Sequence, residues 1–214
     1  RVLFRSGYEI GSVGTVMPDL EVKIGENNEI LLRGKTITTG YYKKPEATAA
    51  AIDKDGWFHT GDAGYLKGNH LYLTERIKDL FKTSNGKYIS PQALETKLSI
   101  DRYIDQIAVI ADQRKFVSAL IVPVYGLVKN YAKEKGLEYK DMADLLQHPK
   151  VQALFRARID TLQQQFAHYE QVKRFTLLSE PFSMERGELT NTLKLKRSVV
   201  AKNYKELIDK MYEE

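Results

Sequence analysis

A hairpin signal within residues 56–82 constrains the fold more than any other feature of the sequence. Lys67-Gly68-Asn69 has the composition of a tight turn, and Leu71-Tyr72-Leu73 after it is typical of an alternating strand. Before the turn, Asp62 follows a glycine in a stretch that we expect to form a β-turn region. After it, the strand stops at a charged cluster that contains Arg76. One hairpin is therefore expected to bring Asp62 and Arg76 close together.

A carboxylate beside an arginine has two interpretations. A carboxylate can accept two hydrogen bonds, which suits a pair of vicinal hydroxyl groups such as those of a ribose, and a guanidinium suits a hydroxyl or a phosphate. The structural alternative is a turn aspartate paired with a surface arginine, because exposed ion pairs are common and contribute little.

Several ordered motifs resemble those of the AMP-forming acyl-CoA synthetases, a superfamily that also contains luciferases and peptide-synthetase adenylation domains. The motifs are Gly40-Tyr41-Tyr42, Trp57-Phe58-His59-Thr60-Gly61-Asp62 and Arg76-Ile77-Lys78. The resemblance covers nearly the whole chain after about residue 10. It implies that Asp62 binds the ribose hydroxyls of ATP and that Arg76 also contacts the ribose.

The composition is that of an ordinary globular protein. The chain has 214 residues, 43% apolar and 29% charged, with a formal net charge of +5 and no cysteine. A disulfide framework and a thiolate metal site are therefore excluded. No apolar run approaches the ~20 residues that span a bilayer, and no secretory signal opens the chain. The cytoplasm is the expected location, with peripheral attachment to a membrane left open. No nucleic-acid partner is expected, since the basic residues are scattered.

The first part of the chain reads as a β-meander with one buried face. Strands are predicted at residues 14–17, 20–24 and 29–34, and a short helix with Pro45 near its first position follows over 45–52. This part resembles the small barrel-like subdomain that closes the large N-terminal domain of the family. Residues 1–77 are accordingly expected to be the end of that domain. Residues 1–6 do not resemble the family and are set aside.

Lys78 marks the expected domain boundary. In the family, the residue two places after the arginine is the hinge about which a small C-terminal lid domain rotates, which implies that residues 78–214 form the lid. A charged residue between two strands suits a hinge, although a solvated lysine on an edge strand is an equally good physical explanation.

A second hairpin is predicted over residues 80–89, with Asn85-Gly86 in its turn. The resemblance places it against the active site during thioester formation, where Gly86 would let the backbone approach the pantetheine arm of CoA and Lys87 would face the same site. A helix is predicted over 92–100, capped by Ser90, with Ala93, Leu94 and Leu98 facing inward.

The remaining elements of the lid are read from apolar periodicity. We expect strands at 104–111, 116–123 and 172–178, and helices at 127–135, 139–147, 150–166 and 199–211, the last of them a single terminal helix. His148 and His168 are isolated, and neither is expected to be catalytic. Together with the first meander, these elements predict a mixed α/β (α+β) fold.

The last functional stretch is residues 183–197. Most members of the family carry a glycine immediately before the catalytic lysine, and here Leu193 takes that place, as in the long-chain fatty acyl branch. The resemblance assigns the catalytic role to Lys194, with Lys196 as the alternative because the alignment is ambiguous here. A mobile ammonium can stabilise the negative charge that builds up when a carboxylate attacks a phosphate. The structural alternative is a basic loop leading into a helix.

The resemblance implies a piece of a long-chain fatty acid–CoA ligase, which activates a fatty acid with ATP and Mg²⁺ and transfers the acyl group to CoA. The phosphate loop, the Mg²⁺ ligand and the acyl tunnel of the family lie upstream, so no metal ligand is expected here and the chain alone is expected to be inactive without the N-terminal domain. Another carboxylate-activating enzyme, such as an aryl-CoA ligase or an adenylation domain, is the second option. A noncatalytic basic binding module for RNA or a protein is the third.

Overall fold

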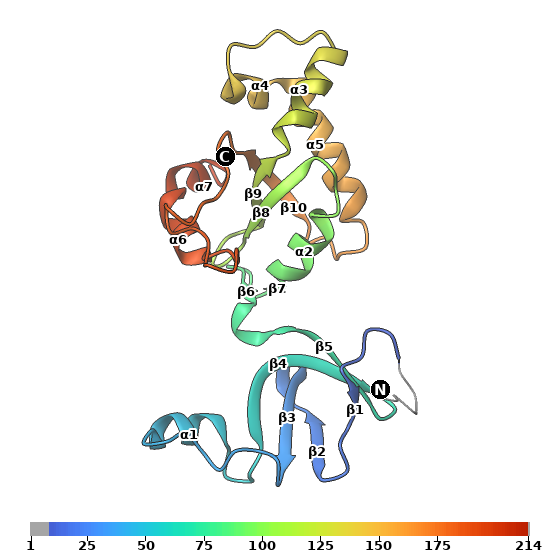
Figure 1. The fold of residues 1–214 in the computed structure, drawn as a ribbon, viewed down its shortest axis with the longest axis vertical. Coiled ribbons are helices and arrows are strands. Elements are labelled where there is room, and N and C mark those ends of the chain that lie inside the picture. Colours follow the sequence, from blue (N-terminus) through green and yellow to red (C-terminus); the bar gives the residue numbers. More distant parts are fainter. Residues whose placement is uncertain (1–8, 214) are drawn as a thin grey trace. The chain divides into compact units, whose positions relative to one another are not determined.

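The computed structural model describes residues 9–213, without the side chains of Glu75 and Lys78. Residues 1–6, which were set aside above, lie outside the described residues. The chain divides into two compact units, Arg1–Leu80 and Phe81–Glu214 (Figure 1). Each unit has its own sheet, so each is described by itself. The predicted mixed α/β fold class is confirmed, because both sheets and helices are present.

The first unit contains a five-stranded antiparallel sheet with the order β1-β5-β4-β3-β2. Within the described residues, β1 and β2 form two separate edges, so the sheet is open and the expected barrel-like closure is not formed. Strand β2 follows the predicted alternation, and the buried apolar residues of the sheet are Ile30, Leu31 and Ala63 within the described part of the chain. Their bounds are Gly14–Thr15 (β1), Leu20–Ile24 (β2), Glu29–Gly34 (β3), Phe58–Lys67 (β4) and His70–Arg76 (β5).

The predicted hairpin between β4 and β5 is confirmed. Lys67 pairs with His70, which leaves Gly68 and Asn69 as a two-residue loop. Gly68 has a positive φ of 59°, as the first central residue of a type II′ turn requires. Strand β4 is longer than expected and extends back through the segment around Asp62 that the sequence favoured as a turn.

Short helical segments join the strands of the first unit. The predicted helix after residue 44 is present as α1 (Pro45–Ala51), with Pro45 at its start. Two 3₁₀ turns complete the unit, η1 (Glu26–Asn28) and η2 (Ile77–Asp79). Lys78 therefore lies in a 3₁₀ turn rather than in an extended link.

The second unit is built around a three-stranded sheet with the order β10-β9-β8. Strand β8 (Ile104–Ile110) is antiparallel to β9 (Val117–Pro123), and β10 (Val172–Leu177) is parallel to β9. Every residue of β9 is buried, because helices cover both faces of the sheet, and this explains why the strand is apolar except at Ser118.

Two sets of helices cover the two faces (Figure 1). One face packs against α2 (Pro91–Leu98), α3 (Tyr125–Glu134), α4 (Met142–Gln147) and α5 (Pro149–Leu162). The other packs against α6 (Arg197–Asn203) and α7 (Lys205–Lys210). The side chains of β9 point alternately to the two faces of the sheet. Ala119 and Ile121 belong to the first core, and Leu120 and Val122 belong to the second. Among the described residues, no helix combines the length and the apolar character needed to cross a membrane.

Two details of the second unit differ from expectation. Ala93 is exposed, whereas Leu94 and Leu98 are buried as predicted. The single terminal helix is instead two short helices that meet at Tyr204, whose φ of −107° and ψ of 21° leave the helical region. The ring of Tyr204 packs edge-on against Phe182, at 5.7 Å between centroids, and the bend lets Ile208 reach the sheet.

A small hairpin begins the second unit, formed by β6 (Phe81–Lys82) and β7 (Tyr88–Ile89). This hairpin is hydrogen-bonded to the turn between β8 and β9. The amide of Ser84 donates to the carbonyl of Arg114 at 3.0 Å, and the amide of Gln113 donates to the carbonyl of Lys82 at 2.8 Å. The end of the chain supports the same turn, because the Tyr212 hydroxyl donates to the carbonyl of Phe116 at 3.0 Å.

Candidate functional site

Asp62 and Arg76 face each other across the β4–β5 hairpin. They are directly opposite in the register, and Nε of Arg76 donates a hydrogen bond to Oδ1 of Asp62 at 3.0 Å. The Asp62 side chain is 30% exposed and that of Arg76 is 70% exposed. The prediction that one hairpin brings these two residues together is confirmed.

The backbone before Asp62 is held by groups that sequence reasoning missed. Gly61 has a positive φ of 70°, and its amide donates to Oε1 of Glu29 at 3.0 Å. The amide of Asp62 donates to the Thr60 hydroxyl at 3.1 Å, and that hydroxyl donates to the carbonyl of Ile30 at 2.7 Å. Strand β3 therefore fixes the segment that presents the carboxylate. The register shift between β3 and β4, which brings Glu29 opposite Ala63, has no local sequence signal.

The pair leaves hydrogen-bonding capacity open to an external ligand. Arg76 uses only Nε in its contact with Asp62, so its two terminal nitrogens are available within the described part of the chain. Asp62 likewise contributes one side-chain oxygen to that contact, and the second remains an acceptor. A carboxylate and a guanidinium side by side suit a group with two neighbouring hydroxyls.

Lys194 lies at the tip of a tight hairpin in the second unit. Leu189 and Leu195 form an isolated antiparallel bridge, and the amide of Lys196 donates to the carbonyl of Glu188 at 2.7 Å. Leu193 has a positive φ of 59°, a conformation that favours glycine. Lys194 and Lys196 are both exposed, and within residues 9–213 neither ammonium group makes a hydrogen bond or ion pair.

A buried carboxylate holds the base of this hairpin. Glu188 is 1% exposed, and its side chain accepts hydrogen bonds from Nε of Arg186 at 3.1 Å, the amide of Ser183 at 3.0 Å and Nδ2 of Asn203 at 3.1 Å. Burial raises the pKa of the Glu188 carboxyl, but these hydrogen bonds outweigh burial and hold the pKa below its ordinary value. The group is therefore an anion at neutral pH. Two of its partners lie in the residues just before it and the third lies in α6, an arrangement that the sequence does not reveal.

The Gly86 hairpin is the other exposed tip of the second unit. Gly86 has a positive φ of 75°, and a side-chain atom placed on it would meet nothing within 4 Å. The space around this backbone is thus open to a ligand. Lys87 is exposed next to it, and its Nζ lies 5.5 Å from the centre of the Tyr169 ring.

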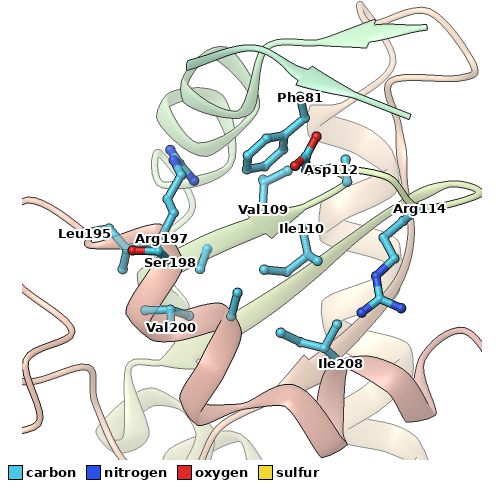
Figure 2. A pocket seen from close by; sticks show the side chains of 13 residues that line it. Phe81, Val109, Ile110, Asp112, Arg114, Leu195, Arg197, Ser198, Val200 and Ile208 are labelled. Atoms are coloured by element: carbon cyan, nitrogen blue, oxygen red, sulfur yellow. The ribbon is translucent and has the colours of Figure 1, made fainter. Parts of the chain in front are cut away.

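A pocket of about 340 Å³ lies behind the Lys194 hairpin, between β8 and helices α6 and α7 (Figure 2). Leu195 and Arg197 line it on the side of the hairpin, and Ile110, Val200 and Ile208 give it an apolar wall. Arg197 extends from the start of α6 and bonds the carboxylate of Glu95. Neither the pocket nor this ion pair was predicted from the sequence.

The predicted site residues thus fall into three groups. Asp62 and Arg76 are brought together in the first unit, whereas Lys194, Gly86 and Lys87 lie on two exposed hairpin tips of the second. Lys78 belongs to η2, and its side chain lies outside the described residues. Among the described residues, no group of three histidine or acidic side chains is arranged to bind a metal ion.

Comparisons with known proteins agree with one another. Residues 78–214 match the model of the AMP-binding enzyme C-terminal domain. Long chain acyl-CoA synthetase 6, peroxisomal, of Arabidopsis thaliana is 34% identical over 95% of this chain and 32% of its own length. A putative fatty-acid–CoA ligase of Mycobacterium tuberculosis is 35% identical over 95% of this chain and 36% of its own. The chain therefore spans about a third of the length of these relatives.

A solved structure also resembles the fold. It is the A domain of a carboxylic acid reductase from Segniliparus rugosus, in complex with AMP and a co-purified carboxylic acid. Its TM-score is 0.67 at 26% identity, over 86% of this chain and 28% of that one.

Proposed function

The chain belongs to the family of AMP-binding enzyme C-terminal domains, and we propose that it is the C-terminal part of a long-chain fatty acid–CoA ligase. The complete enzyme would activate a fatty acid with ATP to an acyl-adenylate and transfer the acyl group to CoA. The similarity along 95% of the chain to two proteins named for this activity carries the proposal.

Two parts of that enzyme are represented here. We assign residues 1–77 to the end of the large N-terminal domain and residues 78–214 to the lid. The division of the chain into compact units at Leu80 supports this assignment. Lys78, in the 3₁₀ turn just before that division, is the proposed hinge.

Asp62 and Arg76 are the proposed ribose ligands. The free carboxylate oxygen of Asp62 would accept hydrogen bonds from the vicinal hydroxyls of ATP, and the terminal nitrogens of Arg76 would donate to one of them. The hydrogen bond between the two side chains holds both in place before the nucleotide binds, which reduces the entropy lost on binding.

Lys194 is the proposed catalytic group of the first half-reaction. An oxygen of the fatty acid carboxylate attacks the α-phosphorus of ATP, the bond from that phosphorus to the bridging oxygen breaks, and pyrophosphate leaves with the electron pair. An ammonium between carboxylate and phosphate stabilises the charge of this step. Lys194 is preferred over Lys196 because it lies at the hairpin tip, directly after the left-handed residue Leu193.

The Gly86 hairpin is the proposed working face of the second half-reaction. The sulfur of CoA attacks the acyl carbonyl carbon, and the bond from that carbon to the phosphate oxygen breaks. AMP leaves with the electron pair, and the thiol proton passes to water. The open space around Gly86 supports an approach of the pantetheine arm, and Lys87 lies beside it. Mg²⁺ would neutralise phosphate charge in the first step, and we expect its ligand upstream of this chain.

A different carboxylate-activating enzyme is the second candidate, because the solved relative with AMP and a carboxylic acid is a reductase domain. The substrate test separates the two. The complete protein, with ATP, Mg²⁺ and CoA, should convert palmitate to palmitoyl-CoA and AMP, and should turn over benzoate far more slowly. Faster turnover of benzoate, or AMP release without thioester, would contradict the proposal.

The 214-residue chain by itself is the natural control for that assay. We expect it to form no acyl-adenylate. Turnover at about 1 per second or faster, typical of enzymes, would contradict the proposal that catalysis needs the rest of the N-terminal domain. A cytoplasmic location of the enzyme remains a prediction, since the Arabidopsis relative is named as peroxisomal.

A further inference from the structure

The two exposed hairpin tips of the second unit have the same backbone design. One is the five-residue loop Thr83-Ser84-Asn85-Gly86-Lys87, and the other is Thr190-Asn191-Thr192-Leu193-Lys194. We call them the glycine loop and the lysine loop. Each begins with threonine, ends with lysine and has a residue of positive φ in its fourth position: 75° at Gly86 and 59° at Leu193.

Three hydrogen bonds within the glycine loop join its threonine to the residues that follow. The amide of Thr83 donates to the carbonyl of Lys87 at 2.9 Å, and the amide of Gly86 donates to the carbonyl of Thr83 at 2.9 Å. The amide of Lys87 donates to the Thr83 hydroxyl at 3.1 Å. The side chain thus caps a backbone donor that the loop leaves unpaired.

The lysine loop repeats these three contacts. The hydroxyls differ in one further contact, because that of Thr83 donates to the carbonyl of Lys87 at 3.2 Å and that of Thr190 pairs with the Thr192 hydroxyl at 3.0 Å. The amide of Thr190 donates to the carbonyl of Lys194 at 2.8 Å, and the amide of Leu193 donates to the carbonyl of Thr190 at 2.9 Å. The amide of Lys194 donates to the Thr190 hydroxyl at 3.0 Å. The two loops are separated by more than half the length of the second unit. In each of them, the threonine hydroxyl accepts a hydrogen bond from the amide of the lysine that ends the loop.

We propose that Thr190 and Thr83 are positioning residues, Thr190 for the adenylation step and Thr83 for the thioester step. This inference rests on the proposed function, which assigns each loop to one half-reaction. Each hydroxyl holds the amide of its lysine, so it restrains the backbone of that residue and the direction in which the side chain leaves the loop. The threonines themselves touch no substrate.

The hydroxyl is separable from the shape of the loop. Valine has the same branched outline as threonine but cannot accept the amide hydrogen bond, whereas serine keeps the acceptor and loses only a methyl group. A net hydrogen bond is worth about a factor of 2 to 10 in an equilibrium, and misplacement of a catalytic group adds to that loss in the rate.

The test uses the complete enzyme and measures the two half-reactions apart. Pyrophosphate exchange with palmitate and ATP reports adenylation, and palmitoyl-CoA release from synthetic palmitoyl-adenylate and CoA reports the thioester step. Thr190→Val should slow exchange about 10-fold and leave thioester release within about 2-fold of the parent. Thr83→Val should do the reverse. Thr190→Ser and Thr83→Ser should each restore most of the lost rate.

Each loop offers a matched control that removes a different hydroxyl. Within the described residues, the only hydrogen bond of the Thr192 hydroxyl is with that of Thr190, and the Ser84 side chain makes none. Thr192→Val and Ser84→Ala should leave both half-reactions within about 2-fold of the parent, if a single hydrogen bond to the lysine amide is what matters. Thermal unfolding of every variant identifies any loss that comes from instability.

Two variants test the proposed function in the same assays. Lys194→Ala should affect only exchange, and Gly86→Trp only thioester release. If either slows both steps equally, the assignment of loops to half-reactions is wrong. Both of these variants can behave as expected while the role of the threonines is still wrong. That is the conclusion if Thr190→Val and Thr83→Val change neither rate, if they slow both half-reactions equally, or if the serine variants do not restore the lost rate.

Discussion

The guanidinium of Arg197 donates two hydrogen bonds of 2.6 Å to the carboxylate of Glu95, across 102 residues of sequence. The same carboxylate accepts the amide of Val109 at 2.8 Å, and the guanidinium lies 5.6 Å from the centre of the Phe81 ring. This contact joins the start of α6, directly after the Lys194 hairpin, to α2 and β8.

The Arg197–Glu95 pair should contribute measurably to stability. Arg197→Gln leaves a carboxylate that is only 15% exposed without its cation, so we expect a loss of about 1–3 kcal/mol in the free energy of unfolding. Glu180→Gln is the control, because it removes an exposed partner of Arg186 and should cost under about 1 kcal/mol. Urea unfolding of the chain measures both, and equal losses would contradict the importance of the pair.

Asp62→Ala should weaken binding of ATP to the complete enzyme. A charge-assisted hydrogen bond contributes about 1.5–3 kcal/mol, so the dissociation constant of ATP should rise about 10-fold or more. Calorimetry with ATP and with 2′,3′-dideoxy-ATP is the measurement. The parent should prefer ATP and the variant should not, whereas unchanged discrimination would show that Asp62 is not a ribose ligand.

Lys78→Pro should separate the two half-reactions. Proline fixes φ near −65°, which restricts rotation at the proposed hinge. If the lid is held in its adenylating state, pyrophosphate exchange should persist while thioester release falls about 10-fold or more. Asp79→Pro, one residue further in the same 3₁₀ turn, shows whether the effect is specific to position 78. Normal rates in both steps would rule Lys78 out as the hinge.

The left-handed backbone at Leu193, with a φ of 59°, restricts which side chains this position accepts. A β-branched residue at positive φ is strongly disfavoured, so Leu193→Ile should destabilise the fold by about 1–2 kcal/mol. Leu193→Gly should be tolerated and keep adenylation activity, because the Leu193 side chain is 67% exposed and buries little. Urea unfolding and pyrophosphate exchange measure the two effects, and equal stability of the two variants would contradict the left-handed conformation.

Glu188 should make stability depend on pH in the acid range. Its folded-state pKa is held below the ordinary value of 4.5, so its stabilising effect is complete above that pH and is lost as the pH falls through the folded value. Glu188→Gln should therefore destabilise the chain by about 1–3 kcal/mol at neutral pH.

The difference between parent and variant should shrink at pH values below 4.5. Urea unfolding at several pH values gives this dependence. Glu185→Gln, at an exposed neighbouring position, should show no such trend. A constant difference for Glu188→Gln across the whole range would mean that the carboxylate charge contributes nothing.

Local patterns in the sequence predicted most of the elements. The strands of both sheets and the hairpins at Gly68 and Gly86 follow from alternation and turn composition, and these are confirmed. The errors concern tertiary packing. The terminal helix breaks at Tyr204, and its two halves both pack on one sheet face through Val200 and Ile208. A continuous apolar stripe does not reveal such a break.

The site was predicted unevenly for the same reason. The contact between Asp62 and Arg76 follows from a hairpin register, which is local. The contacts of Glu29 with Gly61 and of Glu95 with Arg197 join residues distant in the chain, so no spacing rule identifies them. The roles in catalysis rest on family resemblance and remain predictions.

The support that Tyr212 gives to the β8–β9 turn links the end of the chain to the glycine loop. The Tyr212 hydroxyl and the ion pair of Asp209 with Arg114, at 2.7 Å, hold the turn on which the β6–β7 hairpin rests. A genetic screen for enzymes that make acyl-adenylate but fail to deliver it to CoA should therefore recover alleles at these two C-terminal positions. Such alleles would map more than a hundred residues from the loop they disable.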